Sequence, residues 1–275
     1  KITYDIRFGW FIRSIHKWAS ELMIVTVMLH MTRVYFTGAY RRPRELNWMV
    51  GVLMFFVTLG LGFTGYSLIY DQLSYWAAMV GTEIAESTPL IGPLAADFIR
   101  GGSEVGGNTL TRLYVFHVVI FPAALVGLVV VHIIFVRLQG VTEFEFDEEK
   151  KLEHKTFPLF PDHVLTELLI AILILYILSM MAVIFPAGLG ERANPLITPE
   201  HIKPEWYFYA SFKWLKLTNV YFGILGQVAF AGIILFWPFI DYLLIKWLPK
   251  KGMSIKIGFI GFTFYLILTV WEAMT

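Results

Sequence analysis

The chain has 275 residues, of which 57% are hydrophobic and only 16% are charged. A soluble protein would carry about 25% charged residues, so this composition indicates a membrane protein. The formal net charge of +1 argues against a nucleic-acid-binding surface. Cysteine is absent, which excludes disulfides, cysteine metal ligands and thiol chemistry from this sequence. The first residues show neither an initiator methionine nor a signal-peptide pattern, so we expect a truncated N-terminus.

Six stretches are long and apolar enough to cross the ~30 Å hydrocarbon core of a bilayer. We therefore expect an all-α membrane protein with six transmembrane helices. They lie at about 12–36, 47–69, 113–136, 164–185, 223–247 and 255–271. The third stretch contains Pro122, which predicts a mild bend.

Basic residues gather in the loops that follow the first, third and fifth stretches, so the positive-inside rule places these loops on the cytoplasmic side. The opposite side then has two long loops, at about 70–112 and 186–222, and long loops often carry function. The charged stretch 141–162 is the expected linker between one domain at 1–140 and another at 163–275.

Two histidine pairs lie on the first and third stretches. His16 and His30 are 14 residues apart, and His117 and His132 are 15 apart. At ~100° and ~1.5 Å per residue, each pair lies on one side of its helix with its members roughly 21–22 Å apart. That separation is too long for a shared metal, but two such helices side by side would offer two histidine clamps. A planar cofactor with two axial nitrogens fits each clamp, which favours bis-histidine haem.

An isolated intramembrane histidine is more often a satisfied polar residue than a ligand. Four in matching pairs favour haem, because polar groups in lipid are costly and tend to be functional. Gly51 and Gly65 share the 14-residue period, and a missing side chain lets a bulky ring approach the backbone. Ordinary packing of small residues between membrane helices is the alternative.

Two arginines accompany the first histidine pair. Arg13 lies three residues before His16 and Arg33 three residues after His30, so each shares a helix face with its histidine. Arginine pairs well with carboxylates such as haem propionates. The alternative for Arg33 is a plain positive-inside anchor.

Six short motifs form a specific combination. They are Arg13–His16, His30–Arg33, Arg42–Leu46, Gly65–Leu68, Thr109–Arg112 and Pro204–Tyr207. The combination resembles cytochrome b of the quinol:cytochrome c reductase (bc and b6f) complexes over nearly the whole chain. The charged seam resembles the joint between a b6-like and a subunit-four-like part, as in the Gram-positive type.

The resemblance implies a dihaem four-helix-bundle core followed by a three-helix C-terminal part. His16 and His117 would hold an outer b-type haem, and His30 and His132 an inner one. The other cofactor-binding positions that it implies are Arg13, Arg33, Gly51, Gly65, Arg112 and Arg137, the last near an inner quinone site.

The resemblance also implies an outer quinol site in which Glu205 accepts a proton, with Tyr207 as a second catalytic residue. Its wall would comprise Tyr75, Trp76, Pro204, Glu205, Trp206 and Tyr207. A solvated loop acid is the alternative for Glu205, and loop structure or solvation is expected for His154, His163 and His201.

The implied function is that of the cytochrome b subunit of a proton-translocating quinol:cytochrome c, or plastocyanin-like acceptor, oxidoreductase. Quinol, with menaquinone among the candidates, would be oxidised at the outer face, and electrons would pass through two b haems to a quinone at the inner face. Implied partners are a Rieske iron–sulfur protein, a c-type cytochrome, lipid and a second copy of the complex, without nucleic acid. The implied location is the plasma membrane of a prokaryote.

Three features depart from the family pattern. The helix expected before residue 1 is missing, together with any extra covalently bound haem that it carries in some members. Leu68-Ile69-Tyr70 replaces Leu-Pro-Trp, and Ala77 replaces a pocket glycine. By resemblance, this alanine predicts weak inhibition of the purified complex by methoxyacrylate-type compounds, and tight inhibition would contradict it.

Two other classes remain open. A dihaem membrane anchor of a formate dehydrogenase or nitrate reductase also uses histidine pairs, but would not need the Pro204–Tyr207 loop. A transporter with proton-relaying histidines should place them near mid-bilayer, whereas these lie toward both faces.

Overall fold

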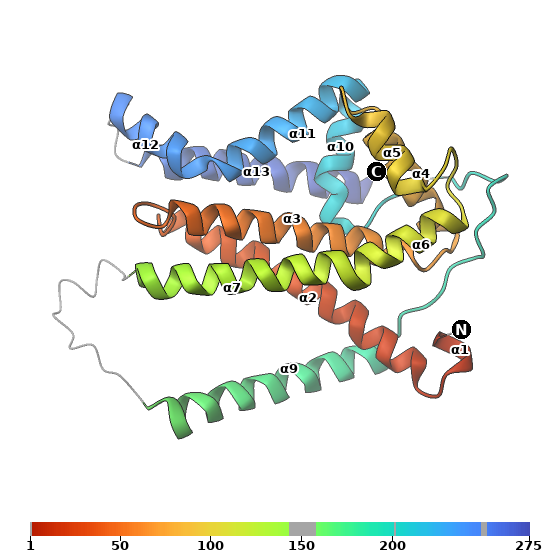
Figure 1. The fold of residues 1–275 in the computed structure, drawn as a ribbon, viewed down its shortest axis with the longest axis horizontal. Coiled ribbons are helices and arrows are strands. Elements are labelled where there is room, and N and C mark those ends of the chain that lie inside the picture. The colour runs from red at the N-terminus through yellow and green to blue at the C-terminus, as the bar shows by residue number, and fades with distance from the viewer. Residues whose placement is uncertain (1, 143–157, 201, 249–251) are drawn as a thin grey trace. The chain divides into compact units, whose positions relative to one another are not determined.

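The computed structural model describes residues 2–142, 158–200, 202–248 and 252–275, and within these ranges the chain is helical (Figure 1). The helices are α1 (Ile2–Asp5), α2 (Gly9–Phe36), α3 (Glu45–Ser67), α4 (Gln72–Glu86), α5 (Gly92–Arg100), α6 (Gly107–Val115), η1 (Phe116–Ile120), α7 (Phe121–Gln139), η2 (Leu159–His163), α9 (Val164–Ile184), η3 (Trp206–Phe208), α10 (Tyr209–Leu217), α11 (Val220–Leu235), α12 (Trp237–Trp247) and α13 (Met253–Met274). The expected all-α class is confirmed.

The chain forms two compact units. The first unit comprises residues 1–27 and 141–188, and the second comprises residues 28–140 and 189–275. Most of the expected linker at 141–162 lies outside the described residues, as do His154 and His201. The domain boundaries expected from the sequence therefore stay a prediction.

Four helical stretches within the described ranges are long and apolar enough to cross a membrane, namely 45–67, 107–139, 159–184 and 253–274. The consecutive helices α11 and α12 make a fifth span if they are taken together. The remaining expected span, at about 12–36, corresponds to α2, which has 28 residues. Polar side chains such as Glu21, His30 and Arg33 lower its hydropathy, so length and composition alone do not mark it as a span.

The fifth expected span is sharply bent, with 75° between α11 and α12. Pro238 lies in the first turn of α12. Proline has no N–H, and its ring clashes with the carbonyl four residues earlier, which here belongs to Ile234. That carbonyl instead accepts a hydrogen bond of 2.7 Å from the indole of Trp48 on α3. The continuous helix expected over 223–247 is therefore broken, and a neighbouring side chain satisfies the polar group that the break releases.

The third expected span contains a π-helical turn. The segment η1 joins α6 to α7 and includes His117, and Pro122 follows in the first turn of α7. Proline at this position disrupts the hydrogen-bond ladder one turn earlier, which accounts for the wider turn. The bend predicted from Pro122 is thus a local change of helix type, and such turns are frequent at functional sites.

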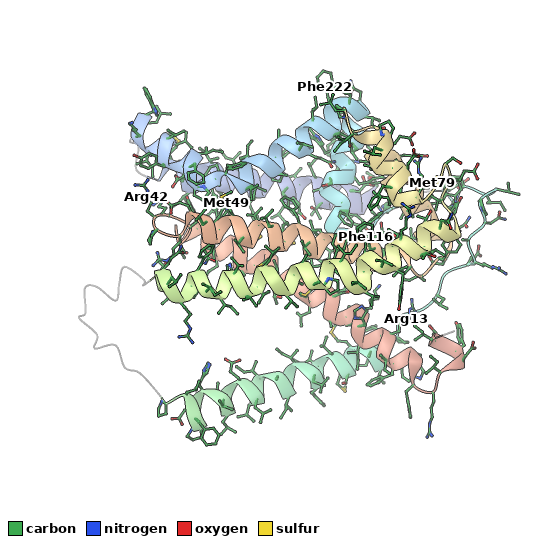
Figure 2. The ribbon with its side chains drawn as sticks, viewed as in Figure 1. Arg13, Arg42, Met49, Met79, Phe116 and Phe222 are labelled. Atoms are coloured by element: carbon green, nitrogen blue, oxygen red, sulfur yellow. The ribbon has the colours of Figure 1, made fainter. Side chains whose placement is uncertain are left out.

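In the second unit, α3 packs along α7 (Figure 1). At the end of this pair where Arg42 and Met49 lie (Figure 2), a buried hydrophobic cluster forms a core. Its members are Tyr40, Trp48, Val52 and Trp237. The opposite end, where Met79 is labelled, holds α4, α5 and α10.

A buried carboxylate binds the loop before α3, next to the cluster of Tyr40 and Trp48. Asp241 on α12 is 1% exposed and accepts a hydrogen bond of 2.8 Å from Arg41 Nε. The Ser254 hydroxyl on α13 also donates to Asp241, and the Tyr35 hydroxyl donates to the Ser254 carbonyl at 2.9 Å. The hydrogen bond to Asp241 raises the pKa of Arg41. The loop before α3 is thereby tied to α12 and α13.

Replacing Asp241 with alanine should lower the free energy of unfolding by about 1–3 kcal/mol, because the buried Ser254 hydroxyl loses its acceptor. Thermal denaturation of the purified protein measures this change. Arg42→Ala is the control, since the side chain of Arg42 is 81% exposed in its ion pair with Glu45 and should contribute less than about 1 kcal/mol. Equal losses in the two variants would contradict the prediction.

Candidate cofactor and quinol sites

His30 and His132 face each other within the second unit. Their ring centres are 6.5 Å apart and the ring planes are inclined by 76°. Two imidazole nitrogens, each about 2 Å from a metal between them, would place the ring centres roughly 6 Å apart. Nδ1 of His132 is buried without a hydrogen-bond partner, so a polar atom of this ring remains unsatisfied. The pair therefore fits a bis-histidine haem.

His117 is oriented by Thr64 of α3. Its Nδ1 lies 3.1 Å from the Thr64 hydroxyl, which also lies 2.8 Å from the Gly60 carbonyl. The hydroxyl has one proton, which it donates to the carbonyl, so we infer that it accepts the Nδ1 proton of His117. This tautomer leaves the lone pair of Nε2 as the coordinating atom, an arrangement common among metal-binding histidines.

Two of the four glycines of α3, Gly51 and Gly65, lie beside the two histidines of the α6–η1–α7 column. A β-carbon at Gly65 would come within 2.8 Å of His117 Cε1, whereas one at Gly51 would lie 3.8 Å from His132 Cε1. The first distance is too short for two carbon atoms, and the second is an ordinary contact. The shared period thus reflects room for imidazole rings, and contact with a porphyrin stays a prediction.

The other residues that the resemblance assigns to cofactor binding either contact backbone and aromatic groups of this chain or are exposed. Arg13 donates to the carbonyls of Ala187 (2.6 Å) and Gly188 (3.0 Å) within the first unit. Arg112 donates to the Phe98 carbonyl, and its guanidinium lies 5.4 Å from the centre of the Phe98 ring. His16, Arg33 and Arg137 are exposed within this chain. Pairing of His16 with His117 stays a prediction, because the two residues belong to different units.

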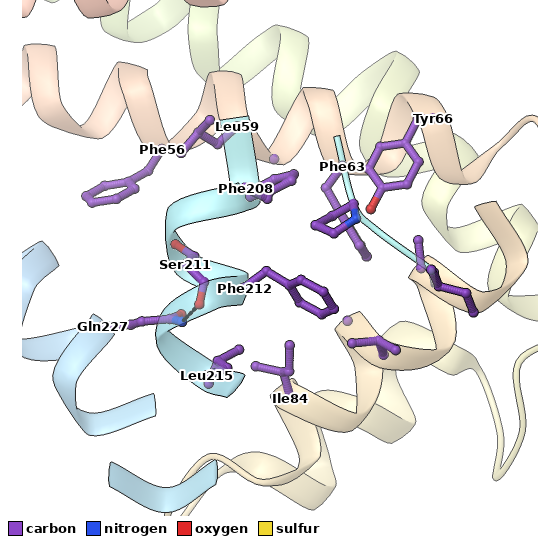
Figure 3. A pocket seen from close by; sticks show the side chains of 16 residues that line it. Phe56, Leu59, Phe63, Tyr66, Ile84, Phe208, Ser211, Phe212, Leu215 and Gln227 are labelled. Atoms are coloured by element: carbon purple, nitrogen blue, oxygen red, sulfur yellow. Dashed lines mark hydrogen bonds between the residues drawn. The ribbon is translucent and has the colours of Figure 1, made fainter. Parts of the chain in front are cut away.

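An apolar cavity of about 420 Å³ lies in the second unit among α3, α4, α10 and the loop before η3 (Figure 3). Its walls are Phe56, Leu59, Gly60, Phe63, Tyr66, Ala77, Val80, Gly81, Ile84, Ile202, Pro204, Phe208, Ser211, Phe212, Leu215 and Gln227. Polar groups are few, and Gln227 donates to the Ser211 carbonyl at 3.0 Å. The cavity therefore suits an apolar ligand with a small polar head.

The expected quinone wall overlaps this cavity only partly. Pro204 lines it, whereas Tyr75 is buried in a cluster with Ala78 and Val105, and Trp76 packs against that cluster. The reason is the helical register of α4, because residues 77, 80, 81 and 84 form one face, and Tyr75 lies on another. The alanine at 77 thus contributes to the wall in place of the larger aromatic side chains.

The Pro204–Tyr207 motif adjoins the cavity. Tyr207 is buried, and its hydroxyl lies so close to Gly62 that a β-carbon there would be 2.8 Å from it. Trp206 stacks edge-on with Tyr207 at 5.5 Å between ring centres. Glu205 directly precedes η3 and follows Pro204, which lines the cavity. The motif therefore places a carboxylate beside the apolar space.

Comparison with known proteins identifies the same family over both parts of the chain. A model described as cytochrome b (N-terminal)/b6/petB matches residues 21–191, and one described as cytochrome b (C-terminal)/b6/petD matches residues 192–275. The chain belongs to the cytochrome b/b6 family. This family implies b-type haem, and together with the apolar helices it makes the chain a multi-pass membrane protein.

Individual relatives agree with the family. Cytochrome b6 of Heliobacterium modesticaldum is 50% identical over 142 residues, which are 52% of this chain and 67% of that protein. The menaquinol:cytochrome c reductase cytochrome b subunit of Bacillus subtilis is 50% identical over 139 residues, covering 50% and 62%. The cytochrome bc complex cytochrome b subunit of Chlorobaculum thiosulfatiphilum is 37% identical over 245 residues, covering 87% and 57%.

A solved structure titled hyperthermophilic respiratory Complex III matches with a TM-score of 0.73 and 28% identity. The match covers 99% of this chain and 81% of that one. The fold is therefore shared with a chain of that complex over nearly all of this chain. The chain spans only 57–67% of the curated relatives named above.

Gly65→Ala should weaken haem binding at His117 about tenfold or more, because the new methyl group displaces the imidazole. The haem-to-protein ratio of the purified protein measures this loss. Gly127→Ala on α7 is the control, since a methyl group there would enter open space and touch neither histidine. Equal haem contents in the two variants would show that the approach to His117 is unimportant.

Proposed function

We propose that the chain is the cytochrome b subunit of a quinol:cytochrome c reductase. In this proposal quinol is oxidised at the apolar cavity, and electrons cross the membrane through two b-type haems to a quinone at the opposite face. The observation that carries it is the facing of His30 and His132 at 6.5 Å, in a chain of the cytochrome b/b6 family. The names of the Bacillus and Chlorobaculum relatives support the same activity.

The histidines would hold the two haems, His30 with His132 and His16 with His117. When bound, haem accepts and donates single electrons without a fixed proton. The chain supplies the ligands, the tautomer that Thr64 imposes on His117, and the arginines. Arg13, Arg33 and Arg112 would then neutralise propionates, and Arg137 would serve an inner quinone site. Gly51 and Gly65 would leave room along α3 for the rings.

The cavity would hold the quinol ring and exclude water from it. Quinol loses two electrons and two protons, so a group beside the ring must remove protons independently of electron transfer. Glu205 is suited to accept one proton, because it stands next to the apolar wall at Pro204. Tyr207 fixes the motif against Gly62, and Trp206 packs on Tyr207. Tyr75 and Trp76 would support the wall from the adjoining cluster.

One electron would leave to a Rieske iron–sulfur protein and then to a c-type cytochrome, while the other crosses the membrane. Menaquinone is favoured by the Bacillus relative, whose name specifies menaquinol. A homodimeric complex in the plasma membrane of a prokaryote would complete the assembly. The Pro204–Tyr207 motif beside the cavity favours this function over a dihaem anchor of another oxidoreductase.

Glu205→Gln should lower quinol:cytochrome c turnover of the purified complex by about 10²-fold or more, because the amide cannot accept a proton. The reduced-minus-oxidised spectrum should be unchanged, since Glu205 is not a haem ligand in this proposal. Glu83→Gln is the control, because Glu83 is an exposed acid on α4 and should leave turnover unaltered. Full turnover of Glu205→Gln would refute the proton-acceptor role.

A further inference from the structure

We propose that Glu272 and Lys216 are positioning residues that fix the ring of Phe212 in the cavity wall. This inference rests on the proposed quinol site, because it concerns the fit of the quinol ring. It arises from a buried charge cluster between α10 and α13, which no part of the electron-transfer scheme uses.

The helix α10 presents different residues to two neighbours. Ser211, Phe212 and Leu215 of α10 line the cavity, together with Phe208 at the end of η3. These residues follow a spacing of three and four positions. In Figure 3 the ring of Phe212 points into this cavity near Ile84. Lys213 and Lys216 lie on α10 as well, but both pair with α13. A displacement of α10 against α13 would therefore move the cavity wall.

Glu272 is the centre of the charge cluster. Its side chain has no exposed surface, and its Oε1 is 2.5 Å from Lys216 Nζ. Its Oε2 lies 3.5 Å from Nζ of Lys213, whose side chain is only 9% exposed. A buried carboxylate is costly unless cations compensate it. The two lysines and the glutamate consequently depend on one another, and α10 is held against α13 at a defined distance.

Lys213 and Lys216 differ in what else they contact. Lys213 Nζ donates to the Thr275 hydroxyl at 3.1 Å and lies 4.6 Å from the centre of the Trp271 ring, both on the side of α13. Lys216 Nζ lies 4.4 Å from the centre of the Phe212 ring. An ammonium at this distance attracts the face of an aromatic ring. Glu272 thus acts on the cavity through Lys216, whereas Lys213 secures the other end of the cluster.

Loss of the charge cluster should affect quinol binding more than proton transfer. Phe212 contributes apolar surface to the wall, and Glu205 lies outside the cluster. Losing the ammonium lets the Phe212 ring rotate away from its place, so the quinol ring is held less closely. We therefore expect weaker quinol binding with the proton-transfer step retained.

The decisive comparison is Lys216→Met against Lys216→Arg in the assembled complex, with a short-chain quinol as substrate. Methionine keeps the length of the side chain but loses the charge, and should raise the quinol KM about two- to fivefold with kcat unchanged. Arginine keeps both the pairing with Glu272 and the stacking on Phe212, so it should restore the wild-type KM. Lys246→Met removes an exposed lysine from the last turn of α12 and should change neither constant. An unchanged KM in Lys216→Met would overturn the proposal.

Phe212→Leu separates this inference from the proposed function. If Phe212→Leu leaves the quinol KM unchanged, the cavity is not the quinol site and the proposed function fails there. If Phe212→Leu raises KM, Lys216→Met should add nothing in the Phe212→Leu background, because its target ring is gone. An additive effect would overturn the positioning role. Haem content and melting temperature of each variant show that it is folded.

Discussion

The close packing of α3 against the α6–η1–α7 column is the constraint on which the second unit depends. Without a side chain at Gly65, the backbone of α3 comes within reach of the His117 ring, and Thr64 next to it orients the same imidazole. Gly51 accompanies His132 at the other level. The apolar surfaces of two membrane helices would pack without any of these residues. The glycines and the threonine specify where along the helices the imidazoles lie and how they are turned.

Two kinds of site lie along α3. Toward Gly51, the second unit presents the facing histidines His30 and His132, and toward Tyr66 it presents the apolar cavity. The histidine pair and the cavity thus lie at different levels of α3, and this one helix sets the distance between them.

The helical class and the histidine periods could be predicted from residue spacing, because 3.6 residues per turn governs every apolar segment. The bend at Pro238 could be suspected from the proline itself. The hydrogen bond that satisfies the released carbonyl of Ile234 could not, because its donor is the indole of Trp48, which lies 186 residues earlier in the chain. Most of the residues that line the cavity, Pro204 excepted, could not be predicted, for a different reason. The lining residues repeat the same spacing in three segments of the chain, at 56, 59, 60 and 63, at 77, 80, 81 and 84, and at 208, 211, 212 and 215. This spacing is visible in the sequence, but it is typical of any packed helix. Only the tertiary structure shows that these residues surround an open space.

The break between α11 and α12 also has a consequence for the surrounding lipid. Helix α11 has 16 residues, which at ~1.5 Å per residue measure about 24 Å, several ångströms less than a hydrocarbon core of ~30 Å. Because α12 departs at 75°, its 11 residues add little to the height of the apolar wall. The bilayer should therefore be thinned locally along this side of the protein, and acyl chains that tolerate thinning would gather there.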